Sequence, residues 1–521
     1  MLEKDVSEST EWVSLGGNNP GNIGGNCHLL THQWTGESGS AEKDAILIDL
    51  GAMFGSKAAG YDQFLPAVDA FLERPGDPVH KKNKLEIAAR GLFLTHGHMD
   101  HIGAIGHFVK RGFKFPPIYC SRLTANLLRA HLAGFISRER QWPTIVEMEP
   151  GQVVSCGKFE VEAVPVSHSV PQSFAFHVRT PKARMVFSGD CKVDQSIPVG
   201  PPTDLPRLAE IGALGVDALM LDSTRVHSPG FTTEEKKVRD TISAIMARHP
   251  DKRIVIAVMG SSLQRVASIV DASTANGRKV IHEGPSIKTN LYALGRAGID
   301  LSAMYPGARI HIGKSQEAQG LSPGQATMLV TGTQGEFLAA LPMAARGQHR
   351  RLHLSPKNDV IIVSASVIPG NETEVGRMLS ALRKQGFTII TAADEEVYSS
   401  GHAATGDVKT IRGAVKPKVL IPVHGSDDHV ATHEVIMAGE GQKTLVIHNG
   451  DIVCFGGEKG AEVIGKRPHV WLGVVEHRQK TPPRLAADAT DIQVFYTYEM
   501  MYEQPKPPVK KPVSPAPVPK I

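Results

Sequence analysis

Short apolar runs rich in β-branched residues alternate along the chain with stretches whose apolar residues recur every three to four positions. The short runs predict strands at 45–51, 91–97, 161–168, 184–190, 218–224, 253–260, 278–284, 327–332, 359–366, 419–425 and 444–455. The longer stretches predict helices at 124–135, 233–249, 261–277 and 371–386. An Asn-Gly turn interrupts the last strand run, and Thr233 is expected to cap its helix. Strands alternating with helices indicate an α/β protein of packed layers.

The length of the chain predicts more than one domain, because 521 residues exceed what one ordinary core can bury. Apolar residues make up 41% and charged residues 21%, the balance of a globular protein. After about residue 456 the alternation fades. The Pro/Lys-rich stretch 504–521 predicts an extended, disordered tail.

The bulk composition excludes several classes of protein. The five cysteines are scattered without a CxxC pair, so a reducing cytoplasm is expected rather than a disulfide framework. The first residues, MLEKDVSEST, are polar, and no run of about 18 apolar residues occurs, so neither a signal peptide nor a membrane partner is predicted. The formal net charge of +4 is compatible with an anionic substrate without requiring one.

The strongest chemical signal is THGHMDHIG at 95–103, where an apolar run ends in potential metal ligands. These are His96, His98, Asp100 and His101. Imidazole nitrogens and carboxylates are the usual ligands of zinc and similar cations. Alternate residues at a strand end point to one side, and the following turn carries the last two ligands to a second position, so the cluster can serve two adjacent metals. The alternative is a polar loop with no such role.

The HxHxDH pattern resembles the signature of the metallo-β-lactamase superfamily, and later motifs follow in that superfamily's order. A lone histidine at a strand end matches His168 in VPVSHSVPQS. An aspartate that bridges two metals matches Asp190 in MVFSGDCKVD. Each residue alone is more typical of a structural role, but its place behind the HxHxDH motif favours a metal ligand.

The second half of the chain is similar to the β-CASP branch of that superfamily, which processes nucleic acids. A long α/β insert follows LDSTR at 221–225, and two histidines come late, His402 in SSGHAATG and His424 in IPVHGSDDH. With Asp222 they match the three β-CASP motifs. Within the branch, residues 12–455 resemble bacterial ribonuclease J through LGGNNPGNIGGNC, VTGTQGE, SASVIPGNE and KPKVLIPVHG.

The resemblance implies an α/β fold, a metallo-β-lactamase αββα sandwich interrupted by an inserted β-CASP α/β domain. It places the sandwich at 1–225 and 396–456, the β-CASP domain at 226–395, a C-terminal extension at 457–503 and the disordered tail at 504–521. We expect the family's small C-terminal α/β domain, which supports oligomerisation, to be missing. A homodimer is therefore left open.

The resemblance also implies two divalent metal ions. One would be held by His96, His98 and His168, the other by Asp100, His101 and His424, with Asp190 between them. Zinc is expected, with manganese as the alternative, because His/Asp sites accept both. Two such cations activate a water beside phosphorus and neutralise charge on the phosphoryl oxygens. The implied catalytic residues are Asp100, Asp190, His402, which would act at the scissile phosphate, and Asp222, which would orient a ligand histidine.

Substrate contacts are implied at two places. Ser364 and Ser366 stand at a strand end, where hydroxyls and amides bind phosphate. His402, Ala403 and Ala404 form the second place, where the family usually reads GHAS. Because Ala404 lacks that serine hydroxyl, the preference for a 5′-monophosphate end is open, with Thr405 as a substitute donor. Gln264 replaces a family histidine in a loop expected to face RNA.

The expected function is a metal-dependent ribonuclease that digests single-stranded RNA from the 5′ end, with endonucleolytic cleavage as a further activity, leaving a 5′-phosphate and a 3′-hydroxyl. One alternative is a hydrolase of the same fold that acts on DNA or a small ester. Another is a catalytically silent RNA-binding subunit. The long insert favours a polymeric substrate, and the complete set of ligands argues against the silent subunit.

Overall fold

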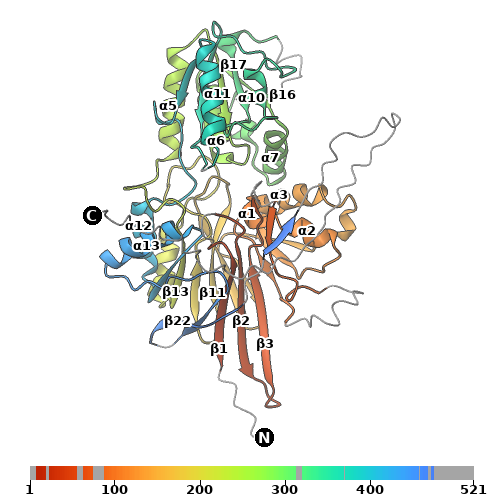
Figure 1. Ribbon diagram of the computed structural model, residues 1–521, viewed down its shortest axis with the longest axis vertical. Helices are drawn as coiled ribbons and strands as arrows, with labels where there is room; N and C mark the ends of the chain where they lie inside the picture. Colours follow the sequence, from red (N-terminus) through yellow and green to blue (C-terminus); the bar gives the residue numbers. More distant parts are fainter. Residues whose placement is uncertain are drawn as a thin grey trace, which may run out of the picture.

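The structure of the chain is a computed structural model with a β-rich body below a smaller α/β body (Figure 1). It describes residues 8–18, 23–54, 63–73, 87–312, 320–368, 370–456, 458–467 and 471–474. The predicted tail at 504–521 and most of the predicted extension at 457–503 lie outside the described residues. Among the described helices, none is long and apolar enough to cross a bilayer.

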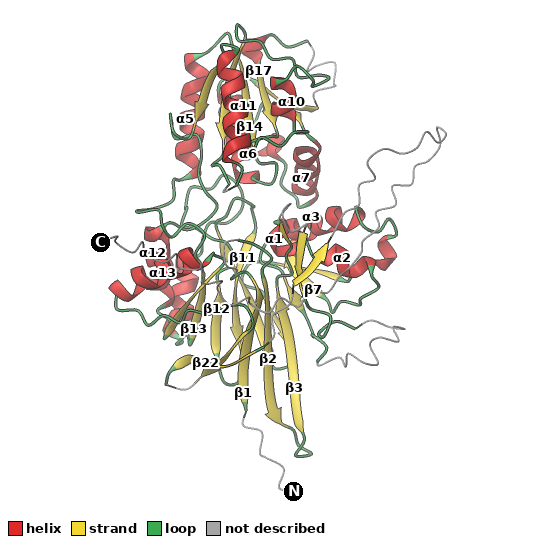
Figure 2. Ribbon diagram, in the orientation of Figure 1, coloured by secondary structure: helices red, strands yellow, loops and turns green. Residues whose placement is uncertain are grey.

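Two sheets stack face to face in the lower body (Figure 2). The first has the order β22-β21-β1-β2-β3-β6-β7-β8. Its strands are β1 (Ser9–Gly16), β2 (Cys27–Thr35), β3 (Ala41–Ile48), β6 (Leu92–Phe93), β7 (Ile118–Ser121), β8 (Ile145–Met148), β21 (Asp451–Gly456) and β22 (Gly460–Lys466). The second has the order β20-β13-β12-β11-β10-β9. Its strands are β9 (Val153–Cys156), β10 (Phe159–Val166), β11 (Ser173–Arg179), β12 (Arg184–Phe187), β13 (Ala218–Asp222) and β20 (Val419–Val423).

The strands of the sandwich are apolar on both sides because each sheet is covered on both faces. Successive side chains of a strand point to opposite faces, so Leu30 packs into the core between the sheets while Leu29 packs toward helices. Trp12 occupies the inter-sheet core, with its ring stacked on Phe455 at 6.3 Å. This double burial explains why the sequence shows continuous apolar runs rather than clean alternation.

Helices complete a four-layered αββα body. On the first sheet lie α2 (Ile105–Lys110) and α3 (Arg122–Ala133), with the single turn α1 (Met99–Ile102) before them. On the second sheet lie α4 (Leu205–Ala213), α12 (Thr405–Val415) and α13 (Asp427–Gly439). A small sheet of β4 (Met53–Phe54), β5 (Gln63–Pro66) and β23 (Trp471–Val474) stands beside them, and η3 (Glu139–Gln141) precedes β8. Together with the upper body this is the architecture that the sequence predicted.

The upper body is a parallel six-stranded sheet with helices on both faces. Its order is β16-β15-β17-β14-β18-β19. The strands are β14 (Arg253–Val258), β15 (Lys279–Glu283), β16 (Ile310–Ile312), β17 (Ala326–Val330), β18 (Asp359–Ser364) and β19 (Thr388–Thr391). Helices α5 (Glu235–Arg248), α6 (Leu263–Ala275) and α7 (Pro285–Arg296) cover one face, and α10 (Ala340–Ala345) and α11 (Glu372–Lys384) cover the other. Two short elements, α8 (Leu301–Met304) and η4 (Pro323–Gln325), lie between strands.

The upper sheet turns the carboxyl ends of its strands toward the sandwich. Helix α5 begins at the sandwich, where the Glu235 N–H donates to Asp194 at 2.9 Å, and runs away from it. Strand β14 must therefore start at the far end and return. Because all six strands are parallel, their carboxyl ends share one edge, the edge at which α/β sheets bind ligands.

Two local predictions were wrong. The run 444–455 forms only one strand, β21, because Asn449 accepts a hydrogen bond from Ser14 at 3.0 Å, which ties the Asn-Gly turn to β1 instead of closing a hairpin. Thr233 does not cap α5, whose N-cap is Glu234, since Asp194 satisfies the first N–H from outside the helix. The predicted domain limits stay predictions.

Candidate metal centre

The predicted ligands meet at one end of the sandwich because the strands that precede them point the same way. Strands β12, β13 and β20 are parallel neighbours, and β10 runs in the same direction with β11 antiparallel between them. His168 follows β10, Asp190 follows β12 and His424 follows β20. Strand β6 of the other sheet delivers His96 and His98 to the same place, and α1 carries Asp100 and His101.

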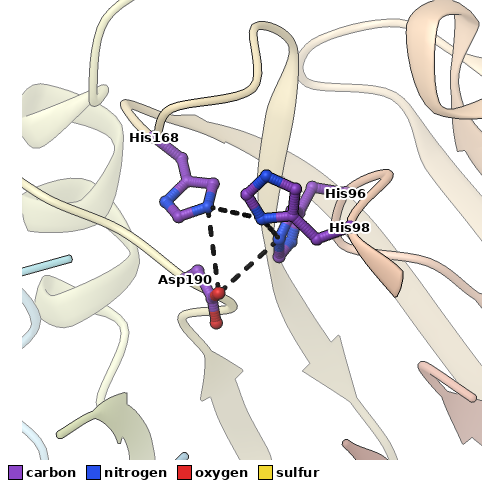
Figure 3. A group of neighbouring side chains, drawn as sticks. All are labelled: His96, His98, His168 and Asp190. Atoms are coloured by element: carbon purple, nitrogen blue, oxygen red, sulfur yellow. Dashed lines mark hydrogen bonds and ion pairs between the residues drawn. The ribbon is translucent and has the colours of Figure 1, made fainter. Parts of the chain in front are cut away.

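The first group of ligand atoms comprises His96, His98, His168 and Asp190 (Figure 3). His98 Nδ1 lies 3.1 Å from Nε2 of His96 and 3.1 Å from Nε2 of His168. Asp190 Oδ2 lies 3.5 Å from His96 Nε2 and 3.8 Å from His168 Nε2. Ligands of a tetrahedral ion with bonds of about 2.0–2.2 Å lie about 3.3–3.6 Å apart, so these separations suit one cation.

The second group comprises Asp100, His101, His424 and again Asp190. Asp190 Oδ1 lies 3.2 Å from His101 Nε2 and 3.5 Å from His424 Nε2. Asp100 Oδ2 lies 3.3 Å from His424 Nε2 and 3.7 Å from His101 Nε2. Asp190 therefore presents one oxygen to each group, so a single carboxylate would serve both.

The surroundings of Asp190 fit a cation and little else. The side chain is 1% exposed, and neither carboxylate oxygen has a hydrogen-bond partner. Burial pushes the pKa of Asp190 upward, but His101, His424, His402 and His96 hold that pKa well below its usual value, so the group is anionic. A buried carboxylate without donors is costly unless a positive charge compensates it. The donor set, imidazoles and carboxylates, suits divalent transition metals.

Two histidines of the first group, His96 and His168, are held in the neutral form that binds a metal. Burial lowers the pKa of both His96 and His168 well below the usual value. His168 Nδ1 donates to the carbonyl of Gly401 at 2.8 Å, which leaves the lone pair of Nε2 facing the ligand cluster. Metal binding needs this unprotonated form, and a hydrogen bond to the other ring nitrogen fixes the tautomer.

Asp49, a residue not predicted to be functional, supports the second group through His101. It follows β3, and its Oδ2 accepts from His101 Nδ1 at 2.7 Å and from the Thr95 hydroxyl at 2.8 Å. Burial lowers the pKa of His101, but the carboxylates of Asp190, Asp49 and Asp100 raise it well above its usual value. The excess of carboxylates around this imidazole is a charge that a cation would balance. The signal in the sequence was an aspartate ending an apolar run, as Asp190 and Asp222 do.

We expect Asp49→Asn to weaken one metal site and spare the other. Asp49 has a φ of 58°, a conformation that asparagine tolerates, so the backbone is kept. The amide offers one neutral oxygen, which cannot accept from His101, the Thr95 hydroxyl and the Thr95 N–H as the two carboxylate oxygens do, and losing such a partner lowers metal affinity about 10–100-fold. Metal content measured against a competing chelator should fall from two ions toward one.

The matched control is Asp217→Asn. Asp217 accepts from the Arg184 N–H at 2.9 Å and pairs with Lys418, at the opposite end of β13. This variant should keep both ions. Equal metal content in the two variants would contradict the role given to Asp49.

Asp222 and His402 form a separate pair beside the ligands. His402 Nδ1 lies 2.8 Å from Asp222 Oδ2, and 3.8 Å from Asp190 Oδ2. Burial lowers the pKa of His402, but Asp222 and Asp190 raise it to about 10. The prediction that Asp222 orients a ligand histidine is corrected, because its partner is His402.

The two serines predicted to contact substrate differ in access. Ser364 is buried, and its hydroxyl accepts from Arg265 at 2.5 Å and donates to the Val397 carbonyl at 2.6 Å. Ser366 is exposed and donates to the hydroxyl of Tyr398 at 3.2 Å. The direct contact predicted for Ser364 is therefore corrected: its hydroxyl is used inside the protein.

The loop after His402 also offers less to a substrate than predicted. Ala403 and Ala404 are buried, and the Ala404 N–H is shared between Thr232 Oγ1 and Asp407 Oδ2, at 3.1 and 3.0 Å. Thr405 cannot replace the absent serine, because its hydroxyl donates to the Val226 carbonyl at 2.8 Å.

Gln264 does not face RNA. It is fully buried in α6, where its amide donates to the Val199 carbonyl at 2.8 Å and accepts from the Val199 N–H at 3.1 Å. The expectation of an RNA-facing loop at this position is therefore wrong. Its role is to join α6 to the sandwich.

Comparison with known proteins identifies the family. Residues 251–382 match the model "Ribonuclease J, beta-CASP domain", and 65–244 match "Beta-lactamase superfamily domain". Ribonuclease J of Mycobacterium tuberculosis is 34% identical over 417 residues, covering 78% of this chain and 69% of that protein. The chain belongs to the ribonuclease J family. It is a hydrolytic ribonuclease of the metallo-β-lactamase superfamily, and divalent metal binding follows from that membership.

Other relatives agree with this membership. Ribonuclease J of Sinorhizobium meliloti is 31% identical over 468 residues, covering 89% of this chain and 78% of that protein. A solved structure, a protein of unknown function from Enterococcus faecalis V583, has a TM-score of 0.56 and 16% identity, covering 86% of this chain and 100% of that one. That likeness concerns the fold alone.

Proposed function

We propose that this ribonuclease binds two divalent metal ions and hydrolyses single-stranded RNA from its 5′ end. The observation that carries the proposal is Asp190, which shares its two unpartnered oxygens between two groups of ligand atoms. His96, His98 and His168 would hold one ion, and Asp100, His101 and His424 the other, with Asp190 common to both. Two bound cations supply an activated water and neutralise charge on the phosphoryl oxygens. Zinc remains the expected metal, with manganese as the alternative.

His402, whose ring is paired with Asp222 beside the ligand cluster, is the general acid of the proposed reaction. A water oxygen adds to phosphorus, the bond from phosphorus to O3′ breaks, and O3′ takes the proton held on the imidazole. One water is consumed overall, its hydroxyl going to the 5′-phosphate and a proton to the 3′-hydroxyl. Asp222, fully buried 2.8 Å away, keeps the ring charged and oriented.

Of the predicted substrate contacts, Ser366 and His402 remain in the proposal. Ser366 is exposed at the carboxyl end of β18, on the edge of the upper sheet that faces the sandwich. A hydroxyl in that place can donate to a phosphate oxygen of RNA. Assembly as a homodimer, location in the cytoplasm and additional endonucleolytic cleavage stay predictions.

The experiment that tests the direction of digestion compares three RNAs of one sequence, with 5′-monophosphate, 5′-triphosphate and 5′-hydroxyl ends. We expect progressive mononucleotide release from the 5′-monophosphate RNA. Because the polar atoms of Ala404 and Thr405 are used inside the protein, a preference of about tenfold or more over the 5′-hydroxyl RNA would require another donor to the terminal phosphate, since a hydrogen bond to a charged group contributes about 1.5–3 kcal/mol. Products of 3′-labelled RNA are separated on a denaturing gel with manganese or zinc supplied.

The same experiment contains its controls. A DNA strand of the same sequence separates the ribonuclease from a deoxyribonuclease. Equal internal cuts in all three RNAs would overturn the 5′-end proposal. Absence of both cleavage and bound metal would instead favour a catalytically silent RNA-binding subunit.

A further inference from the structure

Arg265, near the start of α6, is completely buried and uses all five of its N–H donors. Nε and Nη2 donate to the two oxygens of Glu235 at 3.0 and 2.8 Å. Nη2 also donates to the Ser399 carbonyl at 3.1 Å. Nη1 donates to the Ser364 hydroxyl at 2.5 Å and to the Val397 carbonyl at 3.2 Å. One side chain of the upper body thus holds three separate segments.

Two of these contacts fall on the segment that leads directly to His402. Val397 and Ser399 precede it by a few residues, and the guanidinium also lies 5.5 Å from the ring centre of Tyr398 between them. The segment continues without regular structure to His402, whose N–H donates to Ser400 Oγ at 3.1 Å.

A second buried cation fixes the same segment from the sandwich. Lys192, two residues after Asp190, is 1% exposed. Its ammonium donates to the Ser399 hydroxyl at 2.9 Å and pairs with Asp194 at 2.9 Å. Two buried cations and two buried anions therefore balance around this segment, with Asp194 also accepting the N–H of Glu235 at 2.9 Å. Buried charges paired in this way hold a single geometry, because breaking any one pair leaves an uncompensated charge.

We propose that Arg265 is a positioning residue for catalysis, which sets the place of His402 relative to the metal ligands by clamping residues 397–399. The proposal rests on the proposed role of His402 as general acid. It assigns to the upper body a part in the chemistry, since α6 belongs to that body while His402 belongs to the sandwich. The planar guanidinium of arginine is required for this clamp, because a lysine ammonium at the same place reaches Glu235 or the two carbonyls but not all of them.

The test compares Arg265→Lys with His402→Ala on two substrates of the metal-loaded full chain. One is 5′-monophosphate RNA. The other is uridine 5′-(p-nitrophenyl phosphate), in which p-nitrophenolate takes the place of O3′ and leaves without needing a proton. General acid catalysis contributes about 10²–10⁴-fold, and only to the substrate that needs the proton. We expect His402→Ala to lose about this factor on RNA and far less on the ester. Arg265→Lys should lose about tenfold or more in kcat on RNA and less than about threefold on the ester.

The matched control is Arg278→Lys. Arg278 is also buried and donates to the carbonyls of Lys252 and His249, both at 2.7 Å, but at the far edge of the same sheet. It should cleave both substrates at the unaltered rate. A readout independent of activity is the ¹⁵N-histidine spectrum of the metal-free protein. The imidazole signal missing in His402→Ala should move in Arg265→Lys and stay in place in Arg278→Lys.

The outcomes separate the two proposals. In one outcome, His402→Ala loses activity on RNA alone, while Arg265→Lys loses activity equally on both substrates or on neither. That outcome overturns the role given to Arg265 and leaves the general acid in place. If His402→Ala impairs both substrates equally, the general acid itself is overturned, and the role of Arg265 with it. Selective loss in both variants, with a moved His402 signal and two metal ions retained, supports the proposal.

Discussion

Replacing Asp190 by asparagine is expected to lower the rate of RNA cleavage at least about a thousandfold. A metal pair supplies several kcal/mol of charge stabilisation in the transition state, and every 1.4 kcal/mol is a factor of ten in rate. Among the described residues, Asp190 is common to both proposed metal groups and to a third set of ligand atoms, which it forms with Asp222 and His402. An amide presents a single neutral oxygen, so it cannot serve both metal groups at once.

The measurement is kcat on 5′-monophosphate RNA together with metal content per chain. Asp222→Asn is the informative comparison, because Asp222 is equally buried but contacts His402 rather than the seven proposed ligands. It should keep two ions and lose about 10–100-fold in rate. If Asp190→Asn retained both the ions and the rate, the dinuclear assignment would be wrong.

The residues proposed as metal ligands could be placed together from the sequence because their signal is local and ordered. HxHxDH places four ligands at one strand end, and His168, Asp190 and His424 each follow an apolar run directly. Strands that point the same way in one sheet end together, so residues that follow them are brought together whatever the loops between them do. Asp49 carries the same signal, because it follows the apolar run of β3.

The substrate residues were predicted less well because access depends on packing from distant segments. Ser364 and Ser366 are two residues apart and look alike in the sequence. Arg265 donates a hydrogen bond to Ser364, whereas Ser366 is exposed. Ala404 and Thr405 resemble open loop residues, yet the loop 226–232 covers their polar atoms. The sequence does not show which loop carbonyl will accept a hydrogen bond from which side chain.

Buried charge was the feature hidden most completely. Lysine, arginine, aspartate and glutamate are almost always exposed unless paired, so Lys192 and Arg265 look like surface residues in the sequence. Only the structure shows that each is at most 1% exposed and meets a carboxylate within 3.0 Å. Such pairs are formed by segments far apart in the chain, so no local sequence motif predicts them.

Removing the metals should abolish cleavage and lower the temperature of unfolding. A ligand that binds only the folded state stabilises it by about 2.7 kcal/mol at a concentration 100 times its Kd, so two sites contribute about 5 kcal/mol. With about 2–4 °C for each kcal/mol in domains of 150–250 residues, the midpoint should fall by about 10 °C or more. Calorimetry of the chain before and after treatment with a chelator measures this shift, and added manganese or zinc should restore both midpoint and cleavage.

The location of the proposed ligands predicts which part of the protein the metals stabilise. All seven lie in the sandwich, and the upper sheet between β14 and β19 contributes none of them. A transition of the sandwich should therefore move with metal concentration. Asp190→Asn, which lacks the shared ligand, should show less than half of the shift. If the midpoint of the unaltered chain did not depend on metal, the ions that support cleavage would not be held by this buried set, because binding to Asp190 and its histidines cannot occur without favouring the fold that assembles them.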